Sequence, residues 1–110
     1  MNIVEKIDKG NCSVEELEKL LDEKNPIILY YTMTAIGNYG GYNENIITKL
    51  NKLSFKREAN DKLLGYYKIG DLAIVTLQKI GENVDGISSY QTLDDFERKM
   101  LIQLAKEVGW

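Results

Sequence analysis

The chain has 110 residues, the size of one ordinary domain, and 44% hydrophobic with 28% charged residues fits a folded globular protein. Its 17 acidic residues outnumber 14 basic ones for a net charge of −3, which disfavours direct nucleic-acid binding because phosphates need a basic surface. No apolar run approaches the ~20 residues that span a membrane, and the opening MNIVEKIDKG lacks the apolar core of a secretory signal. The single cysteine, Cys12, cannot form an internal disulfide. We therefore expect a cytoplasmic protein with no membrane partner.

Two short helices are predicted at the start of the chain. A weak helical pattern at Ile3, Val4 and Ile7 ends near Gly10. The stretch 13–16, Ser-Val-Glu-Glu, has the form of a capping box, in which the serine and the glutamate satisfy free amides at a helix start. An amphipathic helix of about 10 residues is expected to follow, because apolar residues recur there on one face.

The next segment is apolar on nearly all sides. Asn25 and Pro26 form a helix start signal, since proline lacks an amide that would be unpaired at that position. The residues from Ile27 to Ile36 then predict a buried helix, and Gly37 is expected to end it. Their β-branched and aromatic side chains leave a strand open. In that alternative, residues 27–34 and 72–77 form the central strands of an α+β fold.

The second half of the chain repeats the alternation of buried and amphipathic helices. An amphipathic helix is expected around Ile46 to Leu53, and residues 57–67 predict a shorter helix broken near Gly65, although whether 56–67 form a separate helix stays open. Asp71 is expected to cap an apolar helix that Gly81 ends. After a loop at 82–91, Thr92 with Asp95 is expected to open the longest helix, whose apolar residues recur at helical spacing. That stripe consists of Leu93, Phe96, Met100, Leu104 and Val108.

A similar helix ending occurs twice, 44 residues apart, since Thr32 aligns with Thr76 and Gly37 with Gly81. The period falls in the range of about 40–47 residues typical of helical HEAT and armadillo repeats. We therefore predict one all-α domain over 1–110, a short HEAT-like array of helical hairpins with five to seven helices. Helices at 1–24 precede two approximate repeat units at 26–55 and 70–108. The predicted core consists of Leu29, Met33, Ile36, Leu72, Val75, Leu77, Ile80, Phe96, Met100 and Leu104.

Residues 68–81, KIGDLAIVTLQKIG, resemble the first helix of a HEAT-like repeat, and residues 30–37, YYTMTAIG, share its ending. In its size, its composition and its Asn- and Lys-rich helical character, the chain resembles bacterial immunity proteins of contact-dependent inhibition and polymorphic-toxin systems. The resemblance implies a cytoplasmic antidote that binds and blocks one cognate toxin domain, often a nuclease. It implies no catalytic activity.

Residues that usually carry catalysis are scarce in this chain. It has no histidine, which removes the commonest general base and the commonest zinc ligand. No glycine-rich dinucleotide or P-loop motif occurs. The acidic clusters, at 15–23 and at 94–97, lie near predicted helix starts, where carboxylates favour the helix dipole. We expect no enzyme activity, no cofactor and no metal site.

A partner-binding face is expected to consist of loop tyrosines and acidic residues, because tyrosine is favoured at interfaces and acids attract a basic partner. Tyr30, Tyr31, Tyr66 and Tyr67 are instead expected to pack in the core. The expected partner is a cognate toxin domain, a basic nuclease, and the alternative is a generic helical adaptor for a peptide or protein. The predicted binding residues are Tyr39, Tyr42, Glu82, Asp85, Tyr90, Asp94 and Asp95.

Overall fold

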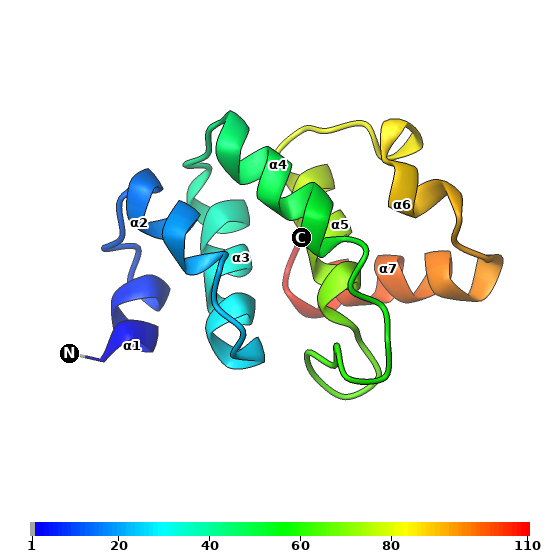
Figure 1. The fold of residues 1–110 in the computed structure, drawn as a ribbon, viewed down its shortest axis with the longest axis horizontal. Helices are drawn as coiled ribbons and strands as arrows, with labels where there is room; N and C mark the ends of the chain where they lie inside the picture. Colours follow the sequence, from blue (N-terminus) through cyan, green and yellow to red (C-terminus); the bar gives the residue numbers. More distant parts are fainter. Residues whose placement is uncertain (1) are drawn as a thin grey trace.

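The computed structural model describes residues 2–110 and is all-α (Figure 1). Within that range it contains seven α-helices, one 3-10 turn and no strand. The all-α prediction and its helix number are therefore confirmed, and the α+β alternative is wrong. The elements are α1 (Ile3–Asp8), α2 (Val14–Leu20), α3 (Pro26–Tyr39), α4 (Glu44–Leu53), α5 (Ile69–Lys79), η1 (Val84–Gly86), α6 (Ser88–Gln91) and α7 (Asp95–Glu107).

Local chemistry sets the starts of the first four helices. At α2 the Ser13 hydroxyl accepts from the Glu16 amide at 3.1 Å, and the Glu16 carboxylate accepts from the Ser13 amide at 3.0 Å, which confirms the capping box. Asn25 caps α3, whose first residue is Pro26, as predicted. Asn2 and Asn43 cap α1 and α4 in the same way. Each cap satisfies an amide that the helix itself leaves unpaired.

The two copies of the Ile-Gly ending behave differently. Gly81 has φ +102 and follows the end of α5, as predicted. Gly37 does not end α3, which continues to Tyr39 and stops at Gly40 with φ +71. The Trp110 indole covers Gly37 so closely that a Cβ there would lie 2.2 Å from the ring. Gly37 thus makes room for a side chain instead of ending a helix.

Two other expected helix starts are shifted. α5 begins at Ile69, so Asp71 lies in its first turn, where its carboxylate accepts from the Lys68 amide at 2.8 Å. α7 is capped by Asp94, whose carboxylate accepts from the Glu97 amide at 2.7 Å. Thr92 instead donates its hydroxyl hydrogen to the Ser89 carbonyl. The N-cap of α5 is therefore Lys68, three residues before Asp71, and the N-cap of α7 is Asp94, two residues after Thr92.

Residues 56–67 form no helix. They make a loop closed by an isolated bridge between Lys62 and Lys68, and the Ile69 amide donates to the Asp61 carbonyl at 2.7 Å. The prediction of a short helix here is therefore wrong. The loop is the green segment at the bottom of Figure 1, whereas residues 80–91 lie at the top.

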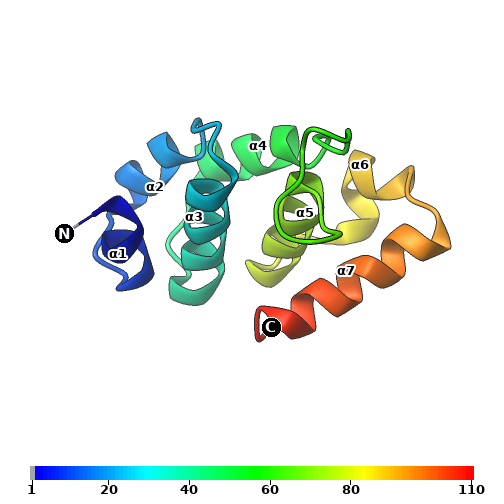
Figure 2. The same cartoon turned by 90° about the horizontal axis from the view of Figure 1, so that it is seen from below.

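Helix α5 is the centre of the packing. It contacts α3, α4 and α7, and every residue from Ile69 to Leu77 is buried. Helices α1, α3 and α5 stand side by side, with α2 contacting both α3 and α4 (Figure 2). None of the helices within residues 2–110 is long and apolar enough to cross a bilayer.

Most of the predicted core is confirmed, but its C-terminal part differs. Leu29, Met33, Ile36, Leu72, Val75, Leu77 and Leu104 are buried. Phe96 is 70% exposed, which contradicts its core assignment, and Ile80 and Met100 are only half-buried. The reason is that α7 buries Leu101 and Leu104, so the side of the helix that carries Phe96 faces outward.

Gly70 allows the start of α5 to approach the end of α4. A Cβ at Gly70 would lie 2.6 Å from the Ser54 carbonyl oxygen and 3.0 Å from that of Lys56. Backbone atoms cannot rotate away, so we expect Gly70→Ala to cost on the order of 1–3 kcal/mol of unfolding free energy in a denaturant titration. Gly86→Ala is the control, because nothing lies within 4 Å of its Cβ position. Equal stability of the two variants would contradict this packing.

Candidate protein-binding surface

Two of the predicted tyrosines lie at the end of α3. Tyr39 is its last residue rather than a loop residue, and although 57% exposed it packs locally. Its ring covers Gly10, and its hydroxyl donates to the Asp8 carbonyl at 2.9 Å. Tyr39 therefore ties α3 to the end of α1. Tyr42, in the loop before α4, is 45% exposed.

The other predicted residues lie at or beyond the end of α5. Tyr90 belongs to α6 rather than to a loop, and the Arg98 guanidinium carbon lies 4.4 Å from its ring centroid, a cation–π contact that occupies one ring face. Glu82, Asp85 and Asp95 are exposed. Asp94 is exposed as well but serves as the α7 cap.

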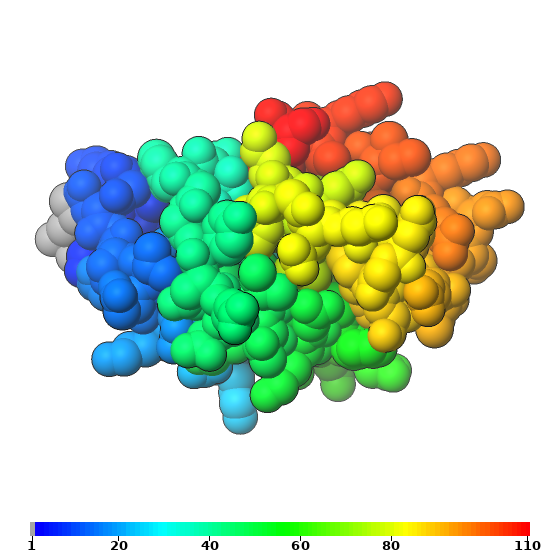
Figure 3. Space-filling view, turned by 90° about the horizontal axis from the view of Figure 1, so that it is seen from above, coloured from blue at the N-terminus to red at the C-terminus, as the bar shows by residue number. Residues whose placement is uncertain are grey.

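These residues do not gather at one point. The first turn of α7 lies at the opposite end of the long axis from α1, and the molecule measures 40 Å along that axis. Figure 3 shows the segment around residues 80–90, in yellow, at the surface between α4 and the start of α7. Glu82, Asp85 and Tyr90 therefore share a region that Tyr39, beside α1, does not.

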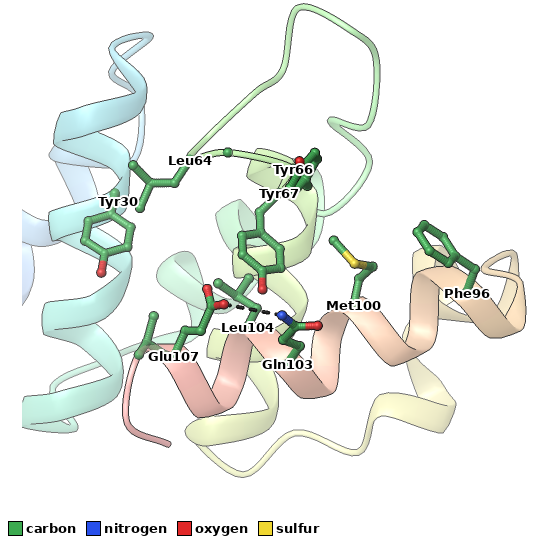
Figure 4. Close-up of a pocket in the computed structure, with 11 residues that line it drawn as sticks. Tyr30, Leu64, Tyr66, Tyr67, Phe96, Met100, Gln103, Leu104 and Glu107 are labelled. Atoms are coloured by element: carbon green, nitrogen blue, oxygen red, sulfur yellow. Dashed lines mark hydrogen bonds between the residues drawn. The ribbon is translucent and has the colours of Figure 1, made fainter.

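A groove that the sequence did not predict lies between α7, the loop residues 64–67 and Tyr30 of α3 (Figure 4). Its volume is about 890 Å³. Three of its apolar side chains face solvent: Tyr66 is 89%, Phe96 70% and Leu64 48% exposed. Exposed apolar side chains grouped in this way are typical of an interaction site.

One charged side chain lines the groove. Glu107 lies beside Tyr67, whose phenol pKa is raised first by burial and then by the neighbouring Glu107 carboxylate. The Gln103 amide approaches the Glu107 carboxylate at 3.5 Å. Within residues 2–110, none of the ion pairs involves Glu107. Glu107 is thus the one charged residue of the groove lining and makes none of these ion pairs.

The loop wall of the groove is held by a partly buried cluster of three charged side chains. The Arg57 Nη2 atom lies 2.7 Å from Asp71 Oδ1 and 3.3 Å from Glu97 Oε2. Arg57 belongs to the loop, Asp71 to α5 and Glu97 to α7. The cluster therefore fixes the loop against α5 and against α7, the helix that forms the other wall of the groove.

Little in the described residues suggests a reactive centre. Over residues 2–110, no group of histidine, cysteine and acidic side chains could hold a metal ion. The Cys12 thiol has a raised pKa, mainly because burial disfavours the thiolate.

The tyrosine assignments explain why the groove was missed. Tyr67 is buried as expected, and Tyr30 and Tyr31 are half-buried against each other in an edge-to-face pair 5.4 Å apart. Tyr66 was expected in the core and is the most exposed of the four. The sequence signal for the groove was in α7. This helix carries apolar residues on more than one face, and packing against the core can bury only one face.

Comparisons with models of known protein families, with curated proteins and with solved structures gave no significant match. The class defined by the fold and the surface is therefore an all-α globular protein with an exposed apolar groove.

Proposed function

We propose that this chain is a protein-binding module that acts by forming a complex and not by catalysis. The observation that carries the proposal is the groove beside α7, where Tyr66, Phe96 and Leu64 are exposed together. Tyrosine, phenylalanine and methionine are enriched in the buried centres of protein interfaces. Burying such side chains against a partner would remove apolar surface from water, which is the main driving force of association.

Within that class, the proposed activity is that of an immunity protein which neutralises a cognate toxin domain, a basic nuclease. Two features support it beside the resemblance of residues 68–81 to a HEAT-like helix. The side-by-side order of α1, α3 and α5, with α2 and α4 packed along them, suits a short HEAT-like array. The net charge of −3 suits a basic partner. A generic adaptor is the alternative, and it would use the same groove for a different protein.

The test is co-expression with any nuclease-toxin domain whose gene neighbours that of this chain. The chain should restore growth of cells that make the toxin, and the purified proteins should form a one-to-one complex. Full loss of the toxin's activity should require one molecule of the chain per molecule of toxin, because a bound inhibitor is not released to act again. Failure to protect would contradict the immunity proposal, and binding without protection would favour the adaptor.

The exposed acids provide a prediction about association rate. Asp85→Lys with Asp95→Lys should slow association with a basic toxin and weaken its salt dependence, because steering depends on surface charge. Asp94 needs a different substitution, since it caps α7 and a lysine there would cost on the order of 1 kcal/mol of stability.

Asp94→Asn is the matched variant, because asparagine keeps the cap while removing the charge. Stopped-flow mixing at two salt concentrations gives the rates. An unchanged association rate for the double variant would show that Asp85 and Asp95 do not contribute to binding.

A further inference from the structure

We propose that the groove beside α7 binds an amphipathic helix of the partner, and that this helix carries a lysine or arginine at the end of its apolar face that meets Glu107. The inference rests on the proposed protein-binding function and adds which element of the partner is bound and what chemistry it presents.

The shape of the groove suits a helix. Its α7 wall runs from Phe96 to Val108, which corresponds to about 18 Å at the helical rise, or about three turns of a partner helix. The opposite wall consists of residues 64–67 and Tyr30. A partner that binds as a β-strand needs a sheet edge to which it can add. Residues 2–110 contain no strand that could provide one.

The apolar anchors lie along the length of the groove. Phe96 and Met100 are one helical turn apart on α7, and Tyr66 lies on their side of the groove, whereas Leu64 lies beside Tyr30 nearer the other end (Figure 4). A helix bound in a groove contacts such a row through residues spaced three or four apart. Large, exposed aromatic side chains are the usual source of binding energy at such sites.

Charge gives the partner helix a direction. Figure 4 shows Glu107 near Tyr30 at one end of the groove and Phe96 at the other. A carboxylate that a partner covers without a cation loses its hydration and gains nothing in exchange. A lysine or arginine on the partner would pair with Glu107 and favour one orientation over the reverse.

The experiment is a selection of displayed random peptides of about 15 residues against the whole chain. Enriched peptides should carry apolar residues at helical spacing and a basic residue at one end, and their circular dichroism should become helical on binding. Phe96→Ala should weaken the best peptide by about tenfold or more. Ile102→Ala is the matched control, because Ile102 is 60% exposed on α7 but does not line the groove.

Glu107→Lys tests the charge separately. In this variant the peptide whose basic residue is replaced by glutamate should bind better than the original, which reverses the order seen with the native chain. Equal binding of the two peptides to the native chain would overturn the charge assignment. No enriched peptide, enriched peptides that bind as extended chains, or equal effects of Phe96→Ala and Ile102→Ala would overturn the groove proposal.

A second copy of the chain is the alternative occupant, and sedimentation of the native chain and of Phe96→Ala tests it. A dimer that Phe96→Ala dissociates would replace the helix proposal. Different results would contradict the helix proposal and the proposed immunity function. Toxin protection that survives Phe96→Ala with Tyr66→Ala would move binding elsewhere, whereas peptide binding without protection would contradict only the immunity proposal.

Discussion

Leu77→Ala is expected to lower the free energy of unfolding by about 2–5 kcal/mol, the range for deleting a fully buried leucine side chain. Leu77 has no exposed surface and lies in α5, the helix that contacts α3, α4 and α7. The truncated side chain would leave a cavity that four packed helices cannot close. A domain of this size has a total stability of about 5–15 kcal/mol, so the loss is a large part of it.

Urea titration followed by circular dichroism measures this loss, with Ile102→Ala as the control. Ile102 is 60% exposed, and its truncation should change stability by less than about 0.5 kcal/mol. A loss at Leu77 as small as that at Ile102 would mean that α5 is not the centre of the core. The m-value should be the same in both variants, because neither changes the surface exposed on unfolding by much.

Asp71→Ala is expected to cost about 3 kcal/mol, because it leaves the Arg57 guanidinium without its closest carboxylate. The Asp71 side chain is 4% exposed and that of Arg57 is 19% exposed, so water replaces the lost partner poorly. The Arg57 Nε and Nη1 atoms are already buried without a hydrogen-bond partner. The substitution also removes the acceptor for the Lys68 amide at the start of α5.

A double-mutant cycle separates the two contributions of Asp71. Arg57→Met in the Asp71→Ala background should recover part of the stability, since an apolar side chain can occupy the site without an unpaired charge. The cap at Lys68 would stay lost in both variants. If Arg57→Met were equally destabilising with and without Asp71, the two side chains would not be coupled and the loop wall of the groove would have another anchor.

The sequence alone favoured an all-helical chain over the α+β alternative and predicted where some of the helices begin. Ser13 accepts from an amide three residues further along and Asn25 from one two residues further along, so their effect depends only on neighbouring residues. The burial of α3 and α5 was also readable, because a helix apolar on nearly all sides must be covered by others. Gly81 follows the end of α5 as expected. Its φ is +102, and no other side chain or backbone atom lies within 4 Å of its Cβ position.

The tertiary structure decided the features that depend on distant residues. Gly37 stays within α3 because Trp110, 73 positions later in the sequence numbering, packs on it and donates its indole hydrogen to Asn38. The loop at 56–67 takes its form from Arg57 reaching Asp71 and Glu97. Local preferences contain no information about such partners.

The candidate binding surface belongs to this second group. The apolar spacing of α7 predicted a helix correctly, but a spacing does not tell which of two apolar faces is buried. Packing of Leu101 and Leu104 against the core left Phe96 in solvent, and the ion cluster holds the loop that carries Leu64 and Tyr66 against α5 and α7. The groove exists because three segments that are separate in the sequence meet there, and only the folded chain brings them together.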